Sequence, residues 1–189
     1  MRTKPTDLVL WSDDALLAVN KPAGVLVIPS AHEPGSDLLA VLQPAFGRLW
    51  VVHRLDRDTS GVMVLARSAD AHRALNSQFA SHTVTKRYHA LVRGMPLWEE
   101  KRIELHLRVD GDRRHRTTVT DTTSGHTRGK PAVTCLRVIE RLQQYTLIEA
   151  IPQTGRTHQI RAHRQPWACR SSLISRMEAV RLCSCRPSS

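Results

Sequence analysis

The sequence predicts a mixed α/β (α+β) chain, built from short strands and a few helices. Short apolar runs rich in β-branched residues recur along it, bounded by glycines or polar residues, which is typical of strands. Between residues 69 and 80 the apolar residues instead recur at helical spacing. At 189 residues the chain is long enough for one domain with a sizeable core.

The first half is expected to hold two hairpins and two helices. Residues 7–11 and 15–19 are apolar runs on either side of a polar turn, and a strand pattern resumes at 25–28. Ser36 is expected to cap a helix over 37–43, and Ser68 a helix over 69–80. Between the two helices, apolar runs at 50–52 and 62–66 predict a second hairpin with a polar loop.

The second half is expected to consist mainly of strands. Residues 84–94 and 101–109 predict single strands, and 132–139 and 145–151 predict an antiparallel pair. The stretch 122–129 is expected to be flexible. Thr157 is expected to begin a helix that places His158 and Arg161 near one face.

The charge balance points toward a polyanionic partner. The chain carries 28 basic and 17 acidic residues, a net charge of +11, and nucleic acid is the commonest polyanion. No run of 18 apolar residues and no apolar leader at the N-terminus are present, so we expect a cytoplasmic protein. The four cysteines lack zinc spacing and are expected to be free thiols, without a metal site or a disulfide.

The polar loop of the second hairpin reads H-R-L-D-R-D-T-S-G over 53–61 and carries the most chemistry. Two carboxylates, Asp56 and Asp58, lie between or beside Arg54 and Arg57. Opposite charges nearby favour the ionised form of a carboxylate. An ionised aspartate can act as a nucleophile or as a general base.

This loop resembles the signature H-R-L-D-x-x-T-S-G of the RluA family of RNA pseudouridine synthases, with all seven fixed letters present. Four further stretches resemble family elements: N-K-P-A-G at 20–24, K-x-Y-x-A-x-V-x-G at 86–94, G-K-x-A-x-T at 129–134, and T-G-R-x-H-Q-I-R-x-H at 154–163. The resemblance covers about residues 11–163.

The resemblance implies a mixed, largely antiparallel central sheet with helices and loops around an RNA cleft. It implies isomerisation of uridine to pseudouridine in ribosomal or transfer RNA, without a metal or cofactor. Asp56 falls on the family's catalytic aspartate, Tyr88 on the tyrosine that stacks on the target base, and Arg161 on the arginine that pairs with the aspartate. We expect a monomer with RNA, and no protein or membrane, as partner. The residues expected to bind RNA or shape its site are His53, Arg54, Arg57, Thr59, Lys21, Lys86, Arg156 and His158.

After His163 the family pattern stops. Members normally continue with a helix, a G-D-x-x-Y-G-like turn and an L-H-A strand, whereas residues 164–189 are rich in arginine, serine and cysteine. We therefore expect a catalytic domain over 1–163 that lacks its C-terminal part, followed by a poorly structured tail that is truncated or out-of-frame sequence. Whether such a chain is active stays open.

Two other functions fit parts of the sequence. A catalytically silent RNA-binding remnant would keep the basic charge and bind RNA in a strongly salt-dependent way without turnover. The letters D-R-D-T at 56–59 also fit D-x-D-x-T, the motif of Mg²⁺-dependent phosphatases. That enzyme would release phosphate from a small ester when supplied with the metal.

Overall fold

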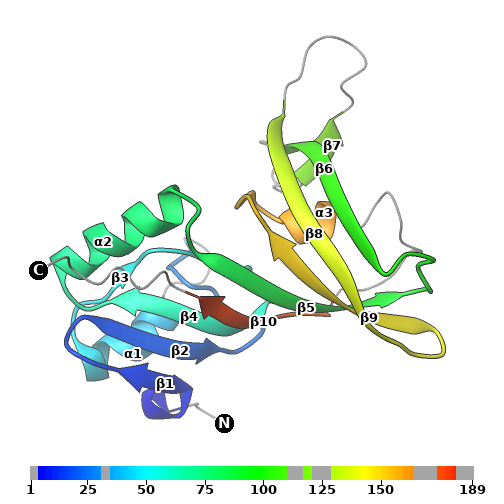
Figure 1. Cartoon of the computed structure of the whole chain (residues 1–189). Coiled ribbons are helices and arrows are strands. Elements are labelled where there is room, and N and C mark those ends of the chain that lie inside the picture. Colours follow the sequence, from blue (N-terminus) through cyan, green and yellow to red (C-terminus); the bar gives the residue numbers. More distant parts are fainter. Residues whose placement is uncertain (1–3, 31–34, 110–116, 121–128, 164–173, 182–189) are drawn as a thin grey trace, which may run out of the picture. The chain divides into compact units, whose positions relative to one another are not determined.

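The computed structural model describes residues 4–30, 35–109, 117–120, 129–163 and 174–181 (Figure 1). The chain forms two compact units, each described here by itself. The first comprises Met1–Lys86 together with Arg176–Ser189, and the second comprises Arg87–Ser175. The catalytic domain expected over 1–163 stays a prediction.

The first unit is built around strand β4 (Ser60–Ala66). A short 3-10 helix, η1 (Pro5–Leu8), precedes β1 (Val9–Ser12), which forms a hairpin with β2 (Leu16–Lys21). Strand β2 runs antiparallel to the whole of β4, and β3 (Trp50–Val51) pairs with its C-terminal end. Both hairpins expected from the sequence are thereby confirmed, although β3 is only two residues long.

Two helices complete this unit. Helix α1 (Leu38–Phe46) begins one residue later than expected, because Asp37 and not Ser36 is its N-cap: the Asp37 carboxylate accepts from the Ala40 N–H. Helix α2 (Ala69–Ala80) begins after Ser68, whose hydroxyl accepts from the Ala71 N–H, as the sequence predicts. Leu75 of α2 packs against the buried side chains of β4. The helices therefore owe their starts to caps and their positions to apolar faces.

The strand expected at 25–28 is absent from the structure, and this prediction is wrong. Val27 is buried, as an apolar run would suggest, but the carbonyls of Val25 and Leu26 accept hydrogen bonds from groups outside a sheet. The Val25 carbonyl accepts from the Lys21 ammonium, and the Leu26 carbonyl accepts from the Leu38 N–H. The segment is therefore an irregular connection that holds α1 and the end of β2.

A strand that the sequence did not indicate lies in the expected tail. Strand β10 (Ile174–Arg181) pairs parallel with β4, with Arg176 opposite Ser60 and Met177 opposite Gly61. The expectation of a poorly structured tail is wrong for this segment. The reason is tertiary: β3 pairs only with the C-terminal end of β4, so the N-terminal end offers backbone groups to another strand.

The second unit is an antiparallel sheet. Its strands follow the spatial order β5, β9, β8, β6 and β7. Four of the five were expected, the exception being β7; their bounds are β5 (Thr85–Arg93), β6 (Glu100–Val109), β7 (Thr117–Thr120), β8 (Lys130–Arg141) and β9 (Tyr145–Pro152). The stretch expected to be flexible, 122–129, lies almost wholly outside the described residues.

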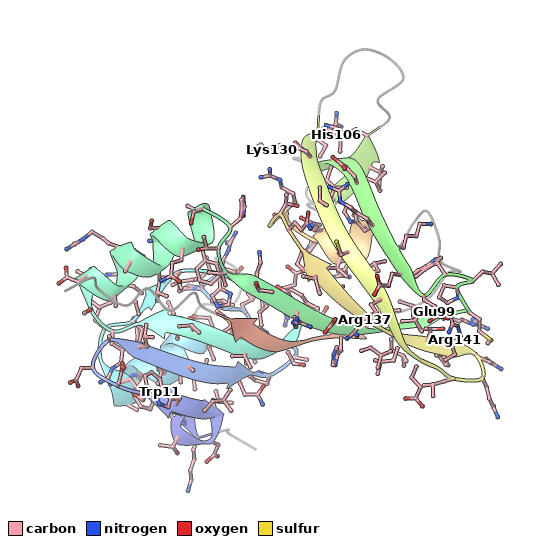
Figure 2. All side chains as sticks on the ribbon, viewed as in Figure 1. Trp11, Glu99, His106, Lys130, Arg137 and Arg141 are labelled. Atoms are coloured by element: carbon pink, nitrogen blue, oxygen red, sulfur yellow. The ribbon has the colours of Figure 1, made fainter. Side chains whose placement is uncertain are left out.

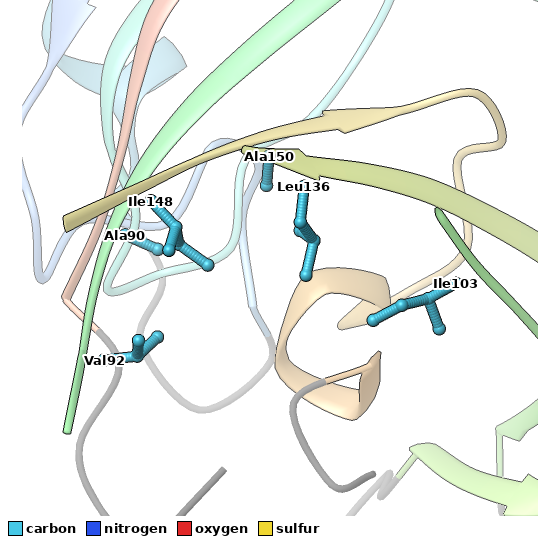
Figure 3. Close-up of a cluster of buried hydrophobic side chains, with 6 residues drawn as sticks. All are labelled: Ala90, Val92, Ile103, Leu136, Ile148 and Ala150. Carbon is cyan, nitrogen blue, oxygen red and sulfur yellow. The ribbon is translucent and has the colours of Figure 1, made fainter. Parts of the chain in front are cut away.

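One face of this sheet carries the core of the unit. The buried cluster comes from alternate positions on four strands and consists of Ala90, Val92, Ile103, Leu136, Ile148 and Ala150 (Figure 3). Helix α3 (Gln159–His163) contributes Ile160 to this cluster. On the opposite face, Glu149 is buried between Arg87 and Arg137, and at the end of β8 Arg141 pairs with Glu99 (Figure 2).

Candidate functional site

The loop between β3 and β4 holds Asp56, the expected catalytic residue. Leu55 and Thr59 are buried on either side of it, and the Thr59 N–H donates to the Asp56 carbonyl over 3.1 Å. The Asp56 side chain is half-buried, whereas Arg54 and Arg57 are exposed. The loop is therefore fixed by two buried side chains and a turn, while its charged groups stay within reach of a ligand.

The N-K-P-A-G turn, residues 20–24, holds the Asp56 loop through hydrogen bonds to Arg57. The Gly24 N–H donates to the Arg57 carbonyl over 2.9 Å, and the Arg57 guanidinium donates back to the Gly24 carbonyl over 3.1 Å. Gly24 has a positive φ of 86°, which explains why a glycine stands there. Two sequence motifs that are 30 residues apart thus form one unit of structure.

Lys21 lies at the centre of this clamp. Its side chain is fully buried, and the ammonium donates to the carbonyls of Pro22, Val25 and Arg57 over 2.8, 2.7 and 3.0 Å. An ammonium has three hydrogens, and all three have partners. None is left for an RNA phosphate, contrary to the expectation from the sequence.

Burial also changes the acidity of Lys21. It lowers the pKa of the ammonium to about 8, while the nearby charges of Asp58 and Asp56 act in the opposite direction. The group still carries its charge at neutral pH for most of the time. A fixed cation thus lies within electrostatic reach of Asp56.

Two more candidate residues of the first unit flank the same loop. The His53 imidazole accepts from the Val64 N–H and stacks on Phe79. Lys86 is half-buried, burial lowers its pKa, and its charge acts on His53. The first unit therefore brings together Lys21, His53, Arg54, Asp56, Arg57, Thr59 and Lys86.

Tyr88 and Arg161 belong to the second unit. Tyr88 is half-buried on β5 and packs against the core cluster, as does Ile160 of α3. Tyr88 and α3 therefore lie on the same face of this sheet. Arg161 is exposed, between the buried or half-buried Ile160 and Ala162, so α3 uses those neighbours to pack and presents the guanidinium outward.

The segment before α3 differs from the expected helix. His158 has a positive φ of 51° and precedes α3, which begins only at Gln159. His158 and Arg161 are therefore not neighbours on one helical face, and that prediction is wrong. Arg156 is half-buried, and its guanidinium donates to the Pro131 carbonyl over 3.1 Å.

Gln159 is a structural residue of this segment that the sequence did not indicate. Its amide oxygen accepts from the Thr154 hydroxyl and the Arg156 N–H, at 2.8 and 3.0 Å. Its amide nitrogen donates to the Val133 carbonyl and the Thr134 hydroxyl, both at 2.9 Å. A buried amide with all these partners fixes the segment that carries Arg161 onto β8. The only signal in the sequence was an uncharged polar residue among charged ones.

The described residues contain no group of three or more His, Cys, Asp or Glu side chains placed to hold a metal ion. Among the helices of the described chain, none is long and apolar enough to cross a membrane.

Comparisons with known proteins give a consistent result. A family model described as RNA pseudouridylate synthase matches residues 15–165. Ribosomal large subunit pseudouridine synthase D of Zymomonas mobilis is 38% identical over 173 residues, covering 85% of this chain and 53% of that protein. Dual-specificity RNA pseudouridine synthase RluA of Vibrio parahaemolyticus is 38% identical over 169 residues, covering 86% of this chain and 66% of that protein. The chain thus spans about half the length of the first of these relatives.

A solved structure supports the fold. Human RNA Pseudouridylate Synthase Domain Containing 1 matches with a TM-score of 0.76 at 22% identity, covering 91% of this chain and 76% of that one. The mixed α+β fold with a largely antiparallel sheet, expected from the sequence, is confirmed.

Proposed function

Since the chain belongs to the RNA pseudouridylate synthase family, we propose that it converts uridine to pseudouridine in RNA. The observation that carries the proposal is the Asp56 loop: a half-buried carboxylate on a loop clamped by Lys21 and Gly24. The name of the Zymomonas mobilis relative favours ribosomal RNA as the substrate. Transfer RNA stays the other expected class. A cytoplasmic location and a monomeric state stay predictions.

The reaction is an isomerisation within the RNA. The bond between N1 of uracil and C1′ of ribose breaks, the ring turns, and C5 bonds to C1′. The hydrogen at C5 leaves as a proton, and N1 gains one, so no electrons enter or leave. The target uridine must leave its stack to be reached, and single-stranded loops release a base most easily.

Each candidate residue has a role that its surroundings support. Asp56 acts as nucleophile or base, with the Lys21 ammonium within electrostatic reach of it. Tyr88 offers a half-buried ring, and stacking of a base on such a ring contributes about 1–3 kcal/mol. Arg161 presents an exposed guanidinium, a group that suits pairing with a carboxylate or a phosphate.

RNA phosphates are the proposed ligands of the remaining cations. Arg54 is exposed on the Asp56 loop, and Lys86, Arg156 and His158 are half-buried. The net charge of +11 adds a sequence-independent attraction to the RNA backbone. Binding is therefore expected to weaken steeply with salt.

The test is tritium release from RNA labelled at C5 of uridine, because forming the C5–C1′ bond must expel that hydrogen. The purified chain is offered total ribosomal RNA and total transfer RNA separately. Release from one class supports the proposal and identifies the substrate class. A folded protein that binds RNA without release would instead be the silent remnant, and metal-dependent release of phosphate from a small ester would indicate the phosphatase.

A further inference from the structure

The hydrogen bonding of β4 changes character where β3 ends. Strand β3 pairs with β4 through Trp50 and Val51, opposite Ala66 and Leu65. The next N–H along this edge, that of the buried Val64, donates to Nε2 of the His53 imidazole over 3.1 Å. The His53 side chain therefore accepts the hydrogen bond that a backbone carbonyl would accept in a regular sheet. The main chain after β3 can thus leave the sheet and form the Asp56 loop.

The orientation of the His53 ring is fixed by α2. The ring stacks on Phe79, with 4.7 Å between the centroids and 17° between the planes. Phe79 lies in the last turn of α2, which is itself packed on β4 through Leu75. The ring is thus held between a helix and a strand that pack on each other, which keeps its nitrogen aimed at the Val64 amide.

His53 is held in its neutral form. Nε2 can accept the Val64 N–H only when it carries no proton, which assigns the hydrogen of the neutral ring to Nδ1. Burial, together with the charge of Lys86, lowers the pKa of the imidazole to about 4. A neutral ring enclosed in this way is a poor ligand for a phosphate.

His53 precedes Asp56 by three residues, and Arg57 directly follows Asp56. The Arg57 side of the loop is held by Lys21 and Gly24. We propose that His53 is the positioning residue on the opposite side, whose imidazole sets where the Asp56 carboxylate lies, and that it does not contact RNA. The inference rests on the proposed function, because it acts through Asp56.

Two substitutions separate the acceptor from the ring. His53→Phe keeps a ring that can stack on Phe79 but removes the acceptor. His53→Gln removes the ring but places an amide oxygen where Nε2 stood. His72→Phe is the matched control, since His72 also stacks on an aromatic ring, that of Trp50, but its imidazole pairs with Asn76 of α2 and not with an N–H of β4.

The variants are compared by tritium release at saturating RNA, by RNA Kd, and by thermal melting to establish that each is folded. We expect kcat of His53→Phe to fall about tenfold to a hundredfold, as for a misplaced catalytic group. Its Kd should stay within about threefold of the wild type, His53→Gln should recover most of kcat, and His72→Phe should match the wild type.

Three results would overturn the inference. One is an unchanged kcat in His53→Phe. Another is a weakened RNA Kd with kcat retained at saturation, which would make His53 an RNA contact. The third is no recovery in His53→Gln. If His53→Phe does not fold, Phe79→Leu takes its place, because it loosens the ring and should lower kcat at least threefold at constant Kd; an unchanged kcat there contradicts the inference. Absence of turnover by the wild type would overturn the proposed function as well.

Discussion

Replacing Lys21 by methionine would remove the cation at the centre of the Asp56 clamp while keeping the length of the side chain. The Arg57 carbonyl would retain one partner, because the Gly24 N–H also donates to it. The carbonyls of Pro22 and Val25 would lose the ammonium that they accept from. The substitution therefore tests whether a buried lysine, and not only a turn, holds the loop.

The magnitude follows from two opposing terms. Leaving two partly buried carbonyls without this donor costs about 1–3 kcal/mol each. The lowered pKa of Lys21, about 8 instead of 10.5, corresponds to about 3 kcal/mol spent on burying its charge, which the methionine would regain. The net loss in the free energy of unfolding is therefore expected to be about 1 kcal/mol, or about 2–4 °C in Tm for a chain of this size.

The assay is urea unfolding of the wild type, Lys21→Met and the control Lys101→Met, whose side chain is exposed on β6. Lys101→Met should stay within about 0.5 kcal/mol of the wild type. Lys21→Met should also lose turnover, because the loop is released next to Asp56. If the two variants unfold alike and both retain activity, the clamp is not held by Lys21 and the reasoning fails.

Other consequences can be measured in the same way. Gln159→Glu should lower the free energy of unfolding by about 3 kcal/mol in a urea titration at pH 7, because a carboxylate cannot donate to the Val133 carbonyl. The control Gln143→Glu, in the exposed β8–β9 turn, should have little effect. Equal losses in the two variants would contradict this prediction. The folded pKa of His53, about 4, lies below the unfolded value of 6.5, so the unfolded chain binds the proton first and wild-type stability should fall as pH drops from 6.5 to 4. His53→Gln should show a shallower fall in denaturation measured across that range, and identical slopes would refute the assignment. Glu149→Gln should cost only about 1 kcal/mol, and less in high salt, because both arginines that pair with Glu149 are about half exposed; a cost that does not change with salt would argue against an electrostatic origin.

Local patterns were enough to predict much of the fold. Helix α2 begins after Ser68 and ends at Ala80 as its cap and spacing indicate, and the alternation in 101–109 corresponds to β6. In these segments, the contacts that stabilise an element lie on one face of it. The segment 25–28 and strand β10 were mispredicted because distant groups decide them: Lys21 and Leu38 take the carbonyls of the first, and the edge of β4 pairs with the second.

The candidate site was predictable in its motifs but not in its contacts. The H-R-L-D loop and the T-G-R-x-H-Q segment could be found from their letters alone. The burial of Lys21 could not be predicted, since lysines are mostly exposed. This side chain is buried because three carbonyls converge on its ammonium. The buried amide of Gln159 depends in the same way on partners from β8.

Asp56 is proposed to carry the chemistry, and the most direct test compares two carboxylates of one loop. Asp56→Asn and Asp58→Asn are assayed for tritium release from C5-labelled RNA and for RNA affinity. We expect Asp56→Asn to abolish turnover while RNA Kd stays within about threefold of the wild type, and Asp58→Asn to retain turnover. Turnover by Asp56→Asn, or an equal loss in both variants, would contradict this proposal.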